Sequence, residues 1–151
     1  MEKEKEMTAR EYLDQIRILD AQIQNLLQEV EDLRKGILPG GISYQEYVQS
    51  SPDPDPYGTW AGKVEDKETI LNHEIDALVD LRIEVTQSIN RLQDARYIRV
   101  LYLRHVKLMK FWDIAEEMGY DYKYIRNLRK QAFREFEKQF NKNVAQCSSN
   151  P

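Results

Sequence analysis

The stretch FWDIAEEMGYDYKYIRNLRK, residues 111–130, decides the fold of the C-terminal part of the chain. Its pattern predicts a helix, a tight turn and a second helix. Gly119 can adopt the positive φ that ends a helix, and Asp121 can cap the helix that follows. Apolar and small residues at helical spacing give this helix-turn-helix a predicted core of Ile114, Ala115, Met118, Gly119, Ile125 and Leu128. The apolar side of the second helix continues through Phe133, Phe136 and Phe140.

The outer face of the second predicted helix is basic and polar. The apolar spacing leaves outside Tyr122, Lys123, Arg126, Asn127, Arg129 and Lys130. Basic and amide side chains are the types that read guanine and adenine edges in the major groove. Double-stranded DNA is therefore the favoured partner, against the alternative of a three-helix bundle whose charges only solvate its surface.

The charge of the chain changes sign along its length. The 151 residues carry a net charge of −4, which taken alone disfavours nucleic acid. Residues 95–142 hold twelve Lys and Arg against six Asp and Glu, a net +6, whereas residues 1–94 have a net charge of −10. We expect a basic DNA-facing domain over 95–142 and an acidic domain over 1–94 that faces solvent or protein.

The acidic part predicts two long helices. Thr8 and Glu11 have the spacing of a capping box at the start of the first helix. A heptad stripe follows at Ile16, Leu19, Ile23, Leu26, Val30 and Leu33, and a second one, interrupted by Arg82, runs through Leu71, Ile75, Leu78, Val85, Ile89 and Leu92. Clustered Gly and Pro over 36–62 predict a linker between the two helices. The stripes favour an antiparallel, coiled-coil-like hairpin within one chain or a homodimer through the same helices.

The run LYLRHVKLMKFWDIAEEMGYDYKYIRNLRKQAFREF follows, without a gap, a pattern in which L-x-L-R leads into E-I-A, L-G, V-x-x-I and A-L. The matching residues are Leu101, Leu103, Arg104, Ile114, Ala115, Met118, Gly119, Ile125, Leu128, Ala132 and Phe133. In this pattern residues 95–140 resemble region 4 of the sigma-70 family. The resemblance implies base contacts by Tyr122, Lys123, Arg126 and Asn127, and DNA-backbone contacts by Lys110, Trp112, Arg129, Lys130 and Arg134.

The resemblance has departures and an extension. Leu108 stands where the family has a loop glycine, Lys110 replaces the capping Ser or Thr, and nothing upstream resembles a sigma region 2. The segments MTAREYLDQIRILDAQI, QSSPDPDPYG and EIDALVDLRIEV resemble phage and prophage proteins of the DUF1492 type, which are related in layout to ArpU/RinA-type regulators of phage late genes. This implies a transcriptional regulator without a separate sigma core.

Other classes of function find little support in the residues. His73 and Glu74 lack the second histidine of a zinc H-E-x-x-H motif, no glycine-rich phosphate loop is present, and Cys147 is the single cysteine. We expect no enzyme activity, no metal or cofactor, a cytoplasmic location without a membrane span, and a disordered tail over 143–151. The function favoured is a DNA-binding regulator. The alternative is a protein-interaction module that binds RNA polymerase or a sigma factor without reading DNA itself.

Overall fold

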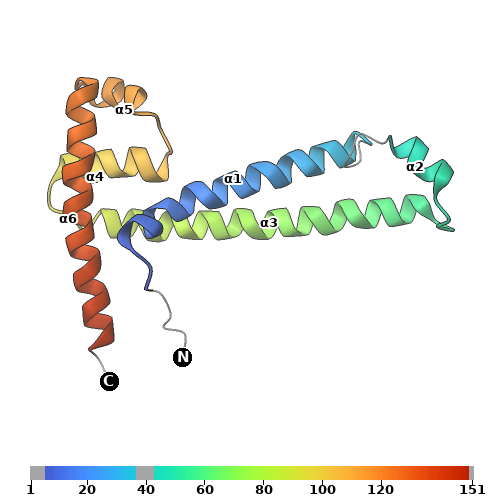
Figure 1. Ribbon diagram of the computed structural model, residues 1–151, viewed down its shortest axis with the longest axis horizontal. Coiled ribbons are helices and arrows are strands. Elements are labelled where there is room, and N and C mark those ends of the chain that lie inside the picture. The colour runs from blue at the N-terminus through green and yellow to red at the C-terminus, as the bar shows by residue number, and fades with distance from the viewer. Residues whose placement is uncertain (1–5, 37–42, 150–151) are drawn as a thin grey trace. The chain divides into compact units, whose positions relative to one another are not determined.

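The regular structure of the chain is helical. The computed structural model describes residues 6–36 and 43–149 (Figure 1). Its elements are α1 (Ala9–Arg34), α2 (Tyr44–Ser50), α3 (Pro56–Ile89), α4 (Ala95–Leu101), the π-helical segment η1 (Tyr102–Val106), α5 (Phe111–Met118) and α6 (Tyr122–Ser148). The prediction of an all-α chain is confirmed.

The chain divides into two compact units. Unit 1 consists of Met1–Ile18 and Asp80–Pro151, and unit 2 consists of Leu19–Val79. This division differs from the domain boundary expected after residue 94. The reason is that the first turns of α1 and the last turns of α3 pack with the C-terminal helices: the Tyr12 hydroxyl lies 3.2 Å from Ser88 Oγ, and the Tyr12 ring stacks on Phe136.

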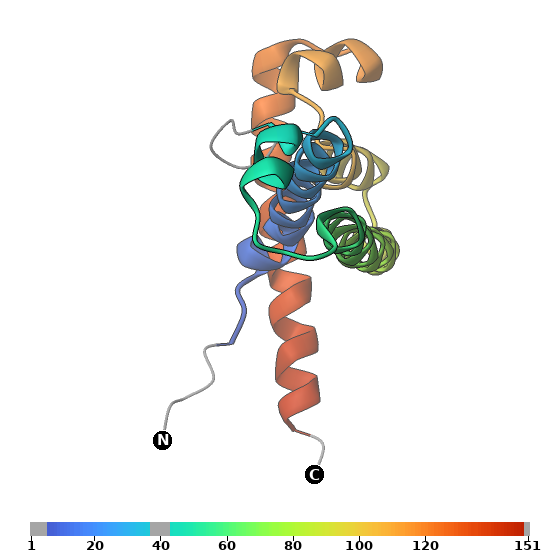
Figure 2. The ribbon, with the colours of Figure 1, turned by 90° about the vertical axis from the view of Figure 1, so that its right-hand side faces the viewer.

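In unit 2, α1 and α3 run side by side in opposite directions (Figure 1, Figure 2). Lys67 Nζ lies 2.5 Å from Glu29 Oε2, and Arg34 pairs with Glu68. The buried side chains between the two helices include Ile23, Val30, Leu33, Leu71 and Leu78. Ion pairs and buried apolar side chains thus both hold α1 against α3.

The predicted stripe is buried unevenly. Ile16, Ile23 and Val30 on α1 and Leu71, Leu78, Val85 and Leu92 after it are all buried at intervals of seven. Leu19 and Leu26 are half-buried, and Ile75 is 36% exposed, which corrects its assignment to the buried stripe. The physical reason is geometric: one partner helix covers a single narrow seam, and residues on the flank of that seam stay open to solvent.

The linker predicted over 36–62 contains helical structure over much of its length. Ser43 and Glu46 form a capping box that begins α2, and α3 already begins at Pro56. Proline is tolerated in the first turn of a helix, because its missing N–H would have no partner there. Tyr44 packs on Tyr57 and Trp60, with ring centroids 5.7 and 4.6 Å apart. Residues 37–42 of this expected linker lie outside the described residues.

Unit 1 is built around the junction of α1, α3, α4 and α6. The capping box of Thr8 and Glu11 is present, with Glu11 N 3.2 Å from Thr8 Oγ1 and Thr8 N 2.9 Å from Glu11 Oε2. The Asp94 side chain accepts the Arg96 amide at 2.9 Å and caps α4. Fully buried side chains include Leu13, Ile16, Val85, Ile89, Leu101, Ile114, Ile125 and Phe136. This core fixes α6 against the other helices of the unit.

The C-terminal tail is not irregular as expected. α6 continues to Ser148, so the disorder expected over 143–151 is wrong for residues 143–148. No glycine or proline occurs between Gly119 and Pro151 to stop the helix. Residues 150 and 151 lie outside the described residues. In the part of the chain that the structure describes, no helix combines the length and apolar character needed to cross a membrane.

Candidate nucleic-acid interface

The turn between α5 and α6 fixes the direction in which α6 begins. Gly119 has a φ of 74°, and the amides of Gly119 and Tyr120 both donate to Ala115 O at 3.0 Å. Asp121 Oδ1 accepts the Tyr124 amide at 2.7 Å and caps α6. The glycine and the aspartate therefore act as the sequence predicted.

The inner face of this helix pair is closed. Ile114, Ala115, Ile125 and Leu128 are buried, while Met118 is half-buried at the end of α5. α6 also packs on α4. Since the inner face is occupied, the opposite face of α6 is the one that the described residues leave open to a partner.

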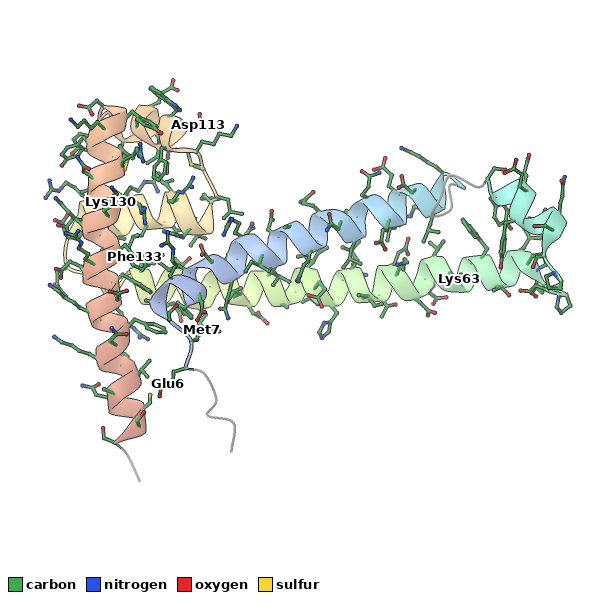
Figure 3. All side chains as sticks on the ribbon, viewed as in Figure 1. Glu6, Met7, Lys63, Asp113, Lys130 and Phe133 are labelled. Carbon is green, nitrogen blue, oxygen red and sulfur yellow. The ribbon has the colours of Figure 1, made fainter. Side chains whose placement is uncertain are left out.

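That opposite face carries most of the expected DNA contacts. The exposed residues of the set on α6 are Lys123, Arg126, Asn127, Lys130 and Arg134. Lys130 lies on α6, and α5 carries Asp113 (Figure 3). Lys110 and Trp112 at the start of α5 are exposed too, Trp112 by 69%. Lys110 precedes the helix without capping it by its side chain, so the first amides of α5 have no side-chain acceptor there.

Tyr122 is half-buried in an aromatic cluster and is not freely presented to a partner. Its ring stacks on Trp112 at 4.2 Å between centroids and meets Phe111 edge-on at 6.2 Å. The Arg126 guanidinium lies 5.7 Å from the Tyr122 ring centroid. Tyr122 therefore orients Arg126 and Trp112, a role that spacing alone did not indicate.

Arg129 departs from its expected place. It was assigned to the exposed face and to DNA-backbone contacts, but it is half-buried and its Nε has no hydrogen-bond partner. The reason is its angular position: Arg129 follows buried Leu128 and precedes half-buried Phe133 by one helical turn. It lines a cavity in unit 1 together with Arg10, Arg104 and His105.

The residue pattern did not predict this cavity, which lies beside the loop of Leu108. Leu108 has a φ of 57°, in the left-handed region, at the position where the resemblance expects glycine. The Arg104 Nη1 donates to Met109 O at 2.9 Å, and its guanidinium lies 4.3 Å from the Phe111 ring centroid. The one indication of the cavity in the sequence is Arg104, the arginine of the L-x-L-R motif, which lines it.

No protein-family model, curated protein or solved structure matches this chain.

His105 and Arg129 both line the cavity described above, and both have shifted pKa values. Burial lowers the pKa of His105 to about 4, with help from the positive charge of Arg129 and of Arg104 and Arg10, while Asp14 acts in the opposite direction. Burial, followed by repulsion from Arg10, lowers the pKa of Arg129. His105 is thus neutral at pH 7. Among the described residues, no group of three or more His, Cys, Asp or Glu is placed to hold a metal ion.

The neutral His105 predicts a loss of stability on acidification. Its pKa is about 4 in the folded chain and 6.5 without the fold, so between these values the unfolded chain binds a proton that the folded chain does not. The free energy of unfolding should be insensitive to this group above pH 6.5 and fall by about 3 kcal/mol as the pH drops to 4. Urea unfolding across this range measures it. His105→Gln should lose this part of the pH dependence, and an equal slope in both proteins would contradict the assignment.

Proposed function

We propose that this protein is a DNA-binding transcriptional regulator of the phage or prophage kind, with a sigma-70 region 4-like helix-turn-helix formed by α5 and α6 and carried on a helical hairpin of α1 and α3. It acts by binding, without catalysis. The observation that carries the proposal is the exposed row on α6, opposite the face that buries Ile125 and Leu128. The row consists of Lys123, Arg126, Asn127, Lys130 and Arg134. In this arrangement α6 enters the major groove of double-stranded DNA.

The roles within the row follow from side-chain chemistry. Arg126 and Asn127 carry the donors and acceptors that pair bidentately with guanine and adenine, and Lys123 adds a donor one turn earlier. Tyr122 holds the Arg126 guanidinium in place through its ring. Lys130 and Arg134 follow at successive turns and contact phosphates. Lys110 and the uncapped first amides of α5 supply a second phosphate contact.

The acidic residues of the chain support a division of labour. Residues 1–94 have a net charge of −10, which DNA repels. This part therefore faces proteins: RNA polymerase, or a second copy of the chain in a homodimer. Such a regulator joins a DNA site to the transcription machinery without the other regions of a sigma factor.

Selection of binding sites from random duplex DNA by the full chain tests the proposal. It should enrich a common sequence, and Arg126→Ala should cost about 1–3 kcal/mol on that sequence while relaxing its preference. Arg126→Lys, which keeps the charge but loses bidentate pairing, should retain nonspecific affinity and lose selectivity. Lys138→Ala serves as a control on the same helix, since Lys138 pairs with Glu135 and lies about three turns beyond Arg126. No enrichment, or an Arg126→Ala protein with unchanged selectivity, would contradict DNA reading.

One observation favours the second candidate, a module that binds RNA polymerase or a sigma factor. Trp112 is 69% exposed although its ring stacks on Tyr122. A fixed and exposed tryptophan is a frequent centre of protein interfaces. Under this alternative Trp112→Ala abolishes polymerase binding, and the full chain enriches no DNA sequence. If Trp112→Ala still binds polymerase and the full chain enriches a DNA sequence, the result favours DNA reading.

A further inference from the structure

A cavity of about 360 Å³ lies in unit 1 between the first turns of α1, the η1 segment with its following loop, and α6. Most of the charged side chains that line it are positive. Four guanidinium groups face it, against one carboxylate, from Arg10, Arg17, Arg104, Arg129 and Asp14. With His105 neutral, the lining has a net charge of +3. Like charges around one cavity repel, so the free protein holds this arrangement at an energetic cost.

The positive charge is only partly compensated inside the protein. Asp14 already pairs with Arg17, with 3.7 Å between Oδ2 and Nη2. The Nε atom of Arg129 and the Nε2 atom of His105 are buried and make no hydrogen bond. A buried polar atom without a partner costs free energy, and such atoms in native proteins commonly mark the place of a ligand or ion.

The cavity is also ordered in advance. Arg104 is held from one side by Met109 O at 2.9 Å and from the other by the ring of Phe111. The apolar part of the lining comes from Leu13, Leu108, Phe111 and Phe133. A volume of this size exceeds that of a bare oxyanion and lies at the lower end of the range of small-molecule sites.

We propose that this cavity binds a small organic phosphomonoester, with its phosphate between the guanidinium groups of Arg10, Arg104 and Arg129 and its organic part against Phe111 and Phe133. The guanidinium group of arginine can donate two parallel hydrogen bonds to phosphate oxygens, and such charge-assisted hydrogen bonds are stronger than those between neutral groups. A bound dianion removes the repulsion and supplies the partner that Arg129 lacks. Because its ligating residues come from α1, η1 and α6, the ligand ties α1 to the helix that carries the basic row. The site is separate from the proposed DNA-reading face and does not depend on it.

The test is urea unfolding of the full chain with phenyl phosphate, inorganic phosphate or chloride, at matched pH and ionic strength. A ligand at ten times its Kd multiplies the folding equilibrium constant about elevenfold. We expect phenyl phosphate to stabilise the fold more than inorganic phosphate, and both more than chloride. Equal unfolding curves in all three salts would overturn the proposal. Stabilisation by inorganic phosphate that phenyl phosphate fails to match would overturn the organic part of it.

Two variants in the cavity sharpen the test. Arg129→Gln should unfold at higher urea than the original protein in chloride, because it removes a repelled and poorly solvated charge, and should no longer respond to phenyl phosphate. Arg10→Gln, at an exposed position of the lining, should lose most of the response while keeping the fold. If both variants respond as the original protein does, the anion binds elsewhere and the proposal fails.

A third variant separates this inference from the proposed function. Lys123→Gln on the exposed row should weaken DNA binding and keep the full phenyl phosphate response. Arg10→Gln should leave DNA binding unchanged and lose most of the phenyl phosphate response. If Arg10→Gln instead lowers DNA affinity and reduces its salt dependence, the guanidinium groups meet DNA phosphates and the small-ligand assignment is wrong. If the phosphate response holds but Lys123→Gln leaves DNA binding intact, the DNA-reading assignment fails alone.

Discussion

Phe136→Ala is expected to lower the free energy of unfolding by about 3–5 kcal/mol, as truncation of a fully buried aromatic side chain does. Phe136 is 1% exposed and lies in α6 at the junction with the first turns of α1. Its ring stacks on Tyr12 and Phe140, with centroids 6.2 Å away in each case. Loss of the ring leaves a cavity that the rigid helices around it cannot close. Urea or thermal unfolding of the full chain measures the change.

A matched pair of variants controls for this effect. Phe136→Leu keeps most of the buried volume and should cost only a fraction of the alanine value. Phe140→Ala, at a half-buried position one turn later, should also cost less. If Phe136→Ala costs no more than Phe140→Ala, the C-terminal half of α6 does not anchor α1 in solution.

Affinity for DNA is expected to fall about 40-fold between about 50 and 200 mM salt, which corresponds to about 2.2 kcal/mol. The figure follows from the exposed cations assigned to DNA phosphates, namely Lys110, Lys130 and Arg134. Each phosphate neutralised adds about 0.9 to the slope of log affinity against log salt, which gives a slope near −2.7. Fluorescence anisotropy with a labelled duplex measures this slope.

Removing two of these cations tests the count. Lys130→Gln combined with Arg134→Gln should reduce the slope by about 1.8. Arg129→Gln should leave the slope unchanged, since Arg129 lines the cavity and not the exposed row. A complex whose affinity does not depend on salt would contradict DNA-backbone contacts altogether and favour a protein partner.

The parts of the fold that the sequence predicts are those with local causes. Thr8, Asp94 and Asp121 cap the starts of their helices through hydrogen bonds from amides two or three residues away, and Gly119 ends α5 through its own backbone freedom. The burial of Ile114, Ile125 and Leu128 follows from the spacing of apolar residues on one helix. Such features depend on a few neighbouring residues, so the sequence carries them directly.

The features that escaped prediction depend on contacts between distant segments. Arg129 has the same chemistry as Arg126 but lies beside the buried face of α6, where the packing of α1 and η1 covers it. Ile75 has the same heptad spacing as its buried neighbours but lies at the flank of the seam. The π-helical η1 has no signature in its residues. The helical start at Pro56 has no clear signal in the sequence, because proline interrupts a helix at most positions and is accepted in its first turn.

α6 runs without interruption from Tyr122 to Ser148, so the exposed basic row and the ring of Phe136 belong to a single stiff rod. Lys123 is thirteen residues from Phe136, about 20 Å along this rod. A tilt of about 10° about Phe136 would swing Lys123 by about 3.4 Å, the rise of one base along a DNA strand. In a helix that reads DNA, a small rocking at the α1 end becomes a shift of one full base step at the other. If α6 reads DNA as proposed, its continuity makes it a lever, through which side-chain packing at Tyr12 sets the register of the helix on the duplex.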